Sequence, residues 1–171
     1  SAVRTGLDVI AVTDHNEIQG ALEAREICKG YGVEVIPGVE VTTREGHLLA
    51  LFVEKNIPKG MSVIEALLLI RDMDGIAIVP HPQQPVPNSI TLKSIQRALE
   101  HPLAREILLG IEVLNMNPGH SPYNQHSQQI AEKLPLAHIA SSDAHMASMI
   151  GAGVTHFEGR SAQRRDGGMR R

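Results

Sequence analysis

The chain alternates between short runs of apolar residues and longer segments in which apolar residues recur every three or four positions. Short apolar runs bounded by turn residues are typical of buried strands, and the longer pattern is typical of amphipathic helices. In chain order the pattern predicts strands over 7–13, 33–36, 39–43, 47–53, 76–79, 111–114, 138–141 and 154–157. It predicts helices over 18–31, 62–73 and 123–133, and one helix or a pair of helices over about 92–108. Strands that alternate with helices predict an α/β fold built on a parallel sheet or barrel.

Local signals sharpen three of these boundaries. Asn16 and Ser62 stand just ahead of predicted helices, with Gln19 and Glu65 three residues further on, which is the spacing of a capping box. The Pro37-Gly38 pair falls between the strands predicted over 33–36 and 39–43 and separates them. The first two helices are therefore expected to begin near these caps.

Length and composition limit the class of protein. The 171 residues are enough for one domain with a real core, which we expect over 1–159, followed by a tail over 160–171. The formal net charge of −3 gives no basic surface for long nucleic acids or anionic membranes. No apolar stretch approaches a membrane span, so a cytoplasmic protein is expected. The lone Cys28 excludes an internal disulfide and a zinc site made of several cysteines.

Residues of the kind that bind metals fall where the apolar runs end. The runs close on Asp14-His15, on Glu40, on His81, on Glu112 with Asn115, and on Asp143 with His145. The carboxyl ends of successive parallel strands meet at one mouth of a barrel or sheet, where α/β active sites are built. We therefore expect imidazoles and carboxylates from four or five segments to converge there, an arrangement that suits a cluster of divalent metal ions.

The two Asp-His motifs each allow a second interpretation. Asp143 and His145 are two positions apart and point the same way if they end a strand, but Asp143 could equally cap a helix beside an incidental histidine. Asp14 either faces the mouth or orients His15 from behind. Taken alone, each motif leaves both interpretations open.

Three further positions differ in how strongly they indicate a site. Glu40 and His47 flank a short turn, and they reach one metal only if their strands pair antiparallel; otherwise they are surface residues. His81 lies between two prolines that fix the backbone on both sides, as a rigid ligand requires. His120, in the loop that follows the strand at 111–114, is a weaker candidate for the same mouth. The remaining histidines are interpreted as structural or solvent-facing: His101, His126, His138 and His156.

Four motifs in order resemble those of the polymerase and histidinol phosphatase (PHP) domain superfamily. They read GLDVIAVTDHN, GVEVT followed by HLL, PHP, and SSDAH, and they extend over about residues 6–159. The resemblance is best to the stand-alone PHP metal-dependent phosphoesterases. It implies a distorted (β/α)7 barrel and a site for up to three Zn, Mn or Fe ions.

The same resemblance assigns roles to individual residues. It implies metal ligands at His15, Glu40, His47, His81, Asp143 and His145. Among these, it gives catalytic roles to His81, Asp143 and His145. It places Asp14, Glu112, Asn115 and His120 beside the site, as substrate-binding or supporting residues.

The chain also departs from the family pattern. The family's HxH motif on the first strand is absent, so the barrel lacks that strand in the chain as given, and we expect about one more strand and helix ahead of Ser1. The loop over 116–125 contains no arginine, although the family often supplies one there to the substrate phosphate. His120 is the candidate replacement.

The function implied is hydrolysis of a small phosphomonoester or nucleotide by a hydroxide that bridges two metal ions. A histidinol phosphatase or a polymerase-linked exonuclease of the same superfamily is a rival, and the lack of a basic surface argues against long nucleic acids. The alternative from another class is a non-catalytic metal-binding or structural PHP-like module, because an incomplete ligand set leaves the chain inactive. The sequence carries no signal for an oligomeric state.

Overall fold

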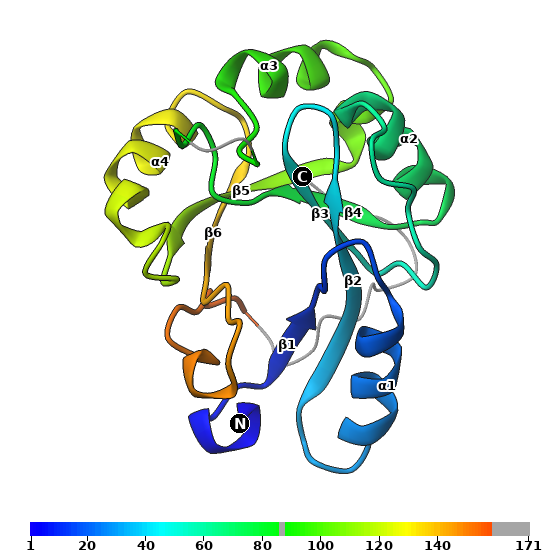
Figure 1. Ribbon diagram of the computed structural model, residues 1–171, viewed down its shortest axis with the longest axis vertical. Coiled ribbons are helices and arrows are strands. Elements are labelled where there is room, and N and C mark those ends of the chain that lie inside the picture. The colour runs from blue at the N-terminus through cyan, green and yellow to red at the C-terminus, as the bar shows by residue number, and fades with distance from the viewer. Residues whose placement is uncertain (86–87, 159–171) are drawn as a thin grey trace.

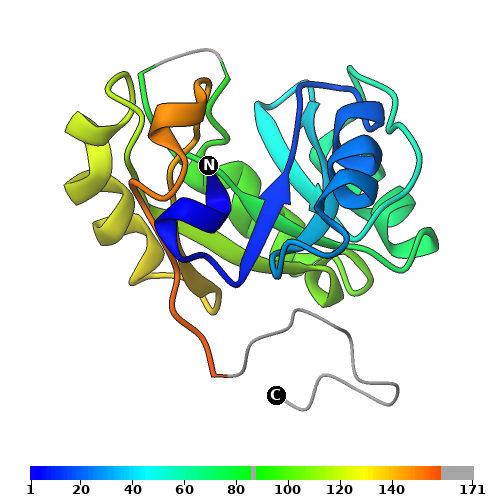
Figure 2. The same ribbon diagram turned by 90° about the horizontal axis from the view of Figure 1, so that it is seen from below.

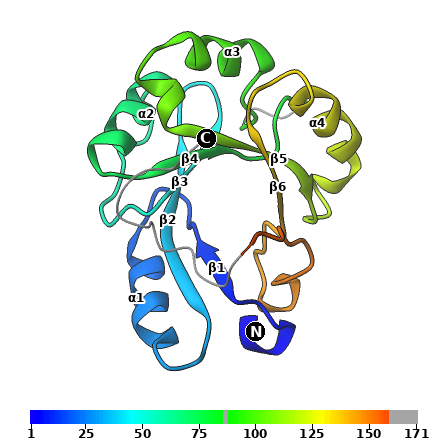
Figure 3. The ribbon, with the colours of Figure 1, turned by 180° about the vertical axis from the view of Figure 1, so that it is seen from behind.

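Six strands form one curled sheet in the computed structural model, which describes residues 1–85 and 88–158 (Figure 1). In sheet order they are β1 (Val9–Val12), β2 (Glu34–Thr42), β3 (His47–Leu51), β4 (Ile76–Val79), β5 (Leu108–Asn115) and β6 (Ala137–Ser141). Each strand is hydrogen-bonded to the next one along the chain, so β1 and β6 are the two edges. Seen from behind, these two edges come round toward each other (Figure 3).

The direction of β3 decides which residues meet at the mouth of the curl. β3 pairs antiparallel with both β2 and β4, whereas the β1–β2, β4–β5 and β5–β6 pairs are parallel. The carboxyl ends of the other five strands therefore lie at one end of the sheet, together with the amino end of β3. Thr42, the last residue of β2, is paired with His47, the first residue of β3.

Helices cover the outside of the curl. They are α1 (Gln19–Cys28), α2 (Val63–Asp72), α3 (Leu92–Glu100) and α4 (Asn124–Ala131), with 3-10 turns η1 (Ala2–Thr5), η2 (Ala104–Glu106), η3 (Ser121–Tyr123) and η4 (Ala147–Met149). Figure 2 shows α1 and α4 on opposite flanks of the sheet. Between helices and strands lies an apolar core that includes Leu48, Leu67, Ile70, Ile95 and Ile111, all without exposed surface.

Most predicted elements are present, and the differences have local causes. The strands predicted over 33–36 and 39–43 are one strand, because β2 runs through Pro37 while pairing with β1 on one side and β3 on the other. The segment over 92–108, predicted as one helix or a pair, contains the two helical segments α3 and η2, because His101 takes an extended conformation ahead of Pro102. The strand predicted over 154–157 is not formed; Thr155 bonds to Ala140 of β6 through its side chain instead.

The two predicted helix caps had different outcomes. The prediction that Asn16 caps α1 was wrong. Its backbone has a φ of 54°, and its side chain forms hydrogen bonds with Thr42 on β2. Ser62 does cap α2, and the reciprocal bonds between Ser62 and Glu65 complete the capping box. The side chain of Asn16 thus joins the end of β1 to the end of β2 rather than starting a helix.

The fold class is confirmed at the level of a mixed α/β fold with a curled sheet. The described residues form six strands in an open curl, and the complete (β/α)7 barrel stays a prediction, as does the domain boundary at 159. The predicted tail over 160–171 lies outside the described residues. No helix among the described residues is long and apolar enough to cross a bilayer.

Removing the α2 cap is expected to destabilise the fold modestly. Ser62→Ala should lower the free energy of unfolding by about 0.5–2 kcal/mol, because the amide of Glu65 loses its acceptor. Ser62→Thr retains the oxygen and should stay close to the unsubstituted chain. Urea denaturation of the three proteins measures the effect, and equal midpoints for all three would show that the capping box does not contribute.

Candidate metal centre

A first cluster forms where β1, β2 and β3 meet. Glu40 Oε1 lies 2.7 Å from His47 Nδ1, and Glu40 Oε2 lies 3.7 Å from His15 Nε2. Backbone pairing sets this geometry, because His15 forms a parallel bridge with Glu40 and the β2–β3 register brings His47 alongside. Glu40 and His47 are buried, whereas His15 is exposed at the rim. His47 belongs here through the amino end of β3, and the antiparallel β2–β3 pair is the arrangement on which its place beside Glu40 depended.

Glu40 is held in its charged form. Burial would raise the pKa of its carboxyl, but hydrogen bonds from His47 and His81 and the charge of His15 lower that pKa to about 2. A buried carboxylate surrounded by three imidazoles is a strong attractor for positive charge. The cluster therefore presents a fixed negative charge at its centre.

A second cluster contains His81, His120 and Asp143. His120 Nε2 lies 3.7 Å from Asp143 Oδ2, and the rings of His81 and His120 stack with centroids 4.4 Å apart. His81 Nε2 also lies 3.4 Å from Glu40 Oε1, which joins the two clusters. In each cluster of three, one ligand atom per residue lies within 4.8 Å of the others. Glu40 thus belongs to the first cluster and contacts His81 of the second, and each cluster could hold a cation.

Two of these residues have unusual backbone conformations. His81 has a φ of 28° and Asp143 a φ of 45°, values that residues other than glycine rarely adopt. Such conformations persist only where the surroundings enforce them, and they concentrate at functional sites.

A buried polar network holds both strained residues. Glu112 accepts hydrogen bonds from the His81 amide at 2.7 Å, from Asn115 Nδ2 at 2.9 Å and from the Ser141 hydroxyl. Asn115 Nδ2 also donates to Asp143 Oδ2 at 3.0 Å. Through this chain of bonds, strand β5 positions one residue from the end of β4 and another from the loop after β6.

His145 and Asp14 lie outside both clusters. His145 is exposed at the rim, with Nδ1 3.5 Å from Asp143 Oδ1 and its ring 6.2 Å from that of His15. The carboxylate of Asp14 faces Gly20 in α1, where an added Cβ would lie 2.3 Å from it. His145 can approach a cation at the rim, while Asp14 is directed toward the helix. Their roles at the site stay predictions.

The other predicted residues lie where their strands place them. Glu112 and Asn115 are buried beneath the clusters. The histidines interpreted as structural belong to neither cluster in the described part of the chain: His101, His126, His138 and His156.

Three contributors were not predicted from the sequence. Gln84 Oε1 lies 2.5 Å from His120 Nδ1, Asn117 Nδ2 donates to the Asp143 carbonyl at 3.2 Å, and Ser141 bonds to Glu112. Glutamine, asparagine and serine are not typical metal ligands. Each of these three side chains lies in a loop or at a strand end and forms a hydrogen bond to a residue of the site. Only Ser141 had a signal, its place directly ahead of Ser142-Asp143.

The donor set fits divalent metal ions. Imidazole nitrogens and carboxylate oxygens are the ligands that zinc and related metals take in proteins. His81 Nδ1 is buried and has no hydrogen-bond partner among residues 1–85 and 88–158. A buried nitrogen without a hydrogen-bond partner destabilises the folded protein, and a bound metal ion would provide the missing partner.

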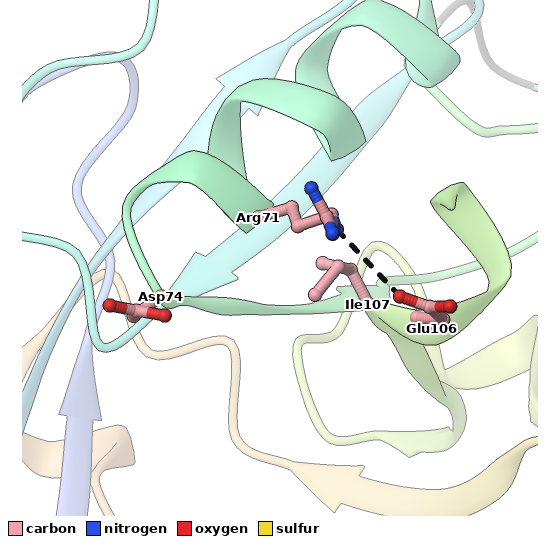
Figure 4. Close-up of a pocket in the computed structure, with 4 residues that line it drawn as sticks. All are labelled: Arg71, Asp74, Glu106 and Ile107. Carbon is pink, nitrogen blue, oxygen red and sulfur yellow. Dashed lines mark ion pairs between the residues drawn. The ribbon is translucent and has the colours of Figure 1, made fainter.

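A separate surface pocket lies at the opposite end of the sheet, near the amino ends of β4 and β5 (Figure 4). It is lined by Arg71, Asp74, Glu106 and Ile107, and Arg71 Nε lies 3.7 Å from Glu106 Oε2. The lining contains no histidine. This pocket therefore takes no part in the metal centre.

Comparisons with known proteins match the chain to a family. The model of the PHP domain matches residues 1–138, and a PHP-associated model matches 121–166. An uncharacterized Methanocaldococcus jannaschii protein is 44% identical over 85 residues, half of each chain. A Haemophilus influenzae 5'-3' exoribonuclease is 33% identical over 81 residues, which is 45% of this chain and 30% of that protein. The chain spans half or less of the length of these two relatives.

A solved structure shows the same fold. It is a two-domain Bacteroides vulgatus protein described as containing a predicted PHP-like metal-dependent phosphoesterase, and it aligns with a TM-score of 0.58 at 22% identity, over 84% of this chain and 47% of that one. The likeness is one of fold. Because the PHP domain model matches residues 1–138, which is most of this chain, the chain belongs to the PHP domain family.

Proposed function

We propose that this chain hydrolyses a phosphoester with the help of divalent metal ions held at the two clusters. The proposed ligands are His15, Glu40, His47, His81, Asp143 and His145. The observation that carries the proposal is the position of Glu40, an ionised carboxylate between imidazoles of both clusters. Bound there, divalent ions lower the pKa of a water molecule and neutralise charge on phosphoryl oxygens.

The chain's own residues define how a substrate would approach. His15 and His145 are exposed at the rim, while Glu40, His47 and His81 are buried below them. A phosphate group therefore enters from the side of the two exposed imidazoles. Every ion pair that the described residues give to Glu40 or Asp143 is with a histidine, so no lysine or arginine neutralises these carboxylates. Added positive charge is what both carboxylates are suited to receive.

The substrate class that fits is a small phosphomonoester or a nucleotide. The net charge of −3 and the absence of tryptophan offer little to a long nucleic acid. The exoribonuclease among the relatives makes a short 5'-phosphorylated oligonucleotide the natural competitor. A non-catalytic metal-binding module is the remaining alternative.

Phosphate release after metal loading and after chelation tests the proposal. We expect hydrolysis of p-nitrophenyl phosphate or a 5'-mononucleotide with Mn²⁺, Zn²⁺ or Fe²⁺, abolished by EDTA and restored by metal. A 5'-phosphorylated oligoribonucleotide in the same assay distinguishes the nuclease activity. Glu54→Gln, an exposed site after β3, is the control that should change nothing.

Two results would contradict the proposal in different ways. A chain that binds metal and hydrolyses none of the three substrates is a binding module. A chain that binds no metal lacks the centre altogether. Metal content by mass spectrometry of the folded protein separates these two cases.

A further inference from the structure

We propose that His120 is an additional metal ligand, acting through Nε2 beside His81 and Asp143, and that Gln84 is the residue that orients it. The inference deepens the proposed function and rests on it. Neither residue belongs to the motifs that identify the family in this chain. The observations that carry it are the contact between Gln84 and His120 and the atoms that His120 then faces.

Gln84 determines which ring nitrogen of His120 carries the proton and which has a lone pair available for a metal ion. Its side-chain oxygen lies 2.5 Å from His120 Nδ1, and an amide oxygen only accepts hydrogen bonds. The proton of a neutral His120 is therefore on Nδ1, and Nε2 carries the lone pair. A hydrogen bond to the remote nitrogen is the usual way in which a metal-binding histidine is oriented.

His120 Nε2 faces another acceptor across a gap that a cation fits. Asp143 Oδ2 lies 3.7 Å from it, which is too long for a hydrogen bond. Two metal bonds of about 2.0–2.2 Å can bridge ligand atoms up to about 4.4 Å apart. Asn115 holds Asp143 Oδ2 in place from the other side, so the two ligand atoms are fixed from behind.

His81 completes the group. Its ring stacks on His120 at an interplanar angle of 10°, and its buried Nδ1 has no partner in the described part of the chain. The loop after His81 also carries Gln84, whose backbone N–H donates to Ser89 Oγ at 2.9 Å, while that hydroxyl donates to the His81 carbonyl. One folded loop therefore positions a ligand and the residue that orients its neighbour.

The buried position of Gln84 is not explained by stability. The side-chain nitrogen Nε2 of Gln84 is buried and has no partner among the described residues. An unsatisfied buried amide costs about 1–3 kcal/mol, which an apolar side chain of the same size would avoid. Orienting His120 explains why a glutamine is nevertheless placed there.

The same tautomer excludes a competing role. A histidine that contacts a substrate phosphate as a neutral group must donate a hydrogen bond, because phosphate oxygens accept. With the proton directed to Gln84, Nε2 has none to donate. His120 is therefore a ligand for a cation and not a stand-in for a phosphate-binding arginine.

NMR of the ring nitrogens tests the tautomer directly. In ¹⁵N-histidine-labelled protein without metal, His120 should show a protonated Nδ1 and an unprotonated Nε2, and added Zn²⁺ should shift the Nε2 resonance. In Gln84→Leu the Nδ1 preference should be lost. A His120 protonated on Nε2 in the unsubstituted chain would overturn the proposal.

Zinc titration by calorimetry tests the ligand. His120→Gln and Gln84→Leu should each weaken one zinc-binding step by about 10–100-fold, and Gln84→Glu, which keeps an acceptor, should stay within about threefold of the unsubstituted chain. The matched controls are His126→Gln and Gln129→Leu, both exposed on α4, which should leave every binding step unchanged.

The outcome separates this inference from the function on which it rests. If the unsubstituted chain binds Zn²⁺ and releases phosphate while His120→Gln and Gln84→Leu bind it equally well, only the assignment of His120 and Gln84 is wrong. If the unsubstituted chain binds no Zn²⁺, both the proposed function and this inference are wrong. Circular dichroism of each variant confirms that it is folded before it is compared.

Discussion

Glu40→Gln should remove metal binding and with it any hydrolytic activity, while the protein stays folded. Glu40 approaches three imidazoles, at 2.7 Å, 3.4 Å and 3.7 Å; two of them belong with it to the first cluster, and the third, that of His81, belongs to the second. Replacing its carboxylate with an amide removes the negative charge at the centre but keeps the size of the side chain. The loss in Zn²⁺ affinity should exceed the roughly 10–100-fold typical of residues that only orient a ligand.

The effect on the rate should follow from the same charge. Metal ions at a phosphoester stabilise the transition state by several kcal/mol, and each 1.4 kcal/mol is about tenfold in rate. We therefore expect kcat/KM to fall by at least about 100-fold at a fixed metal concentration. Calorimetry and phosphate release on the same samples measure both quantities, with Glu54→Gln as the exposed control.

Two results would contradict this account. If Glu40→Gln binds Zn²⁺ as tightly as the unsubstituted chain, the carboxylate is a structural partner of His47. If the variant loses its secondary structure, Glu40 is required for the fold rather than for the metal. Circular dichroism and calorimetry together distinguish these outcomes.

The sequence predicted the segments of the site better than their arrangement. Apolar runs that end in His81 and in Asp143 correctly indicated strand ends, because parallel strands present such ends at one edge. The short turn between Glu40 and His47 allowed an antiparallel pair but did not require one, because the direction of a strand depends on its partners as well as on its own residues. His47 was therefore expected at the site on the condition that its strand pairs antiparallel, and the β2–β3 register meets that condition.

Supporting residues were the least predictable part. Gln84 and Asn117 are polar loop residues whose importance comes only from what they touch, namely His120 and Asp143. No periodicity marks them, because loops carry no repeating pattern of burial. Asn16 shows the opposite case, in which a clear local signal was misleading. Its type and position favoured a helix cap, but its side chain forms a hydrogen bond to Thr42 across the β1–β2 pair instead.

The remaining large effect concerns Glu112, the buried acceptor of the network under the site. Glu112→Ala should lower the free energy of unfolding by about 3–9 kcal/mol, because three buried or half-buried donors lose this acceptor at about 1–3 kcal/mol each. These donors are the amide of His81, Asn115 Nδ2 and the hydroxyl of Ser141. Such a loss is a large share of the roughly 5–15 kcal/mol that holds a domain folded. Glu100→Ala, an exposed glutamate at the end of α3, should cost little.

Glu112→Gln should behave differently, and the difference depends on pH. The amide keeps an oxygen for His81 and Asn115, and its nitrogen can donate to Ser141, so the fold should persist. Burial raises the pKa of the Glu112 carboxyl above its ordinary value of 4.5, although hydrogen bonds from Ser141, His81 and Asn115 act to lower it. A raised pKa means that the folded state binds the proton more tightly than the unfolded state does.

The contribution of Glu112 to stability should therefore fall as the pH rises from about 4.5 through its folded-state pKa, and the glutamine variant should not show that fall. Urea denaturation in EDTA, at half-unit steps from pH 4 to pH 8 with Glu112→Gln beside the unsubstituted chain, measures the difference. The two curves should diverge as the pH rises, with the glutamine variant the more stable at the upper end. Parallel curves would show that Glu112 is charged and fully compensated by its three donors, and the network would then hold His81 and Asp143 through a carboxylate rather than a carboxylic acid.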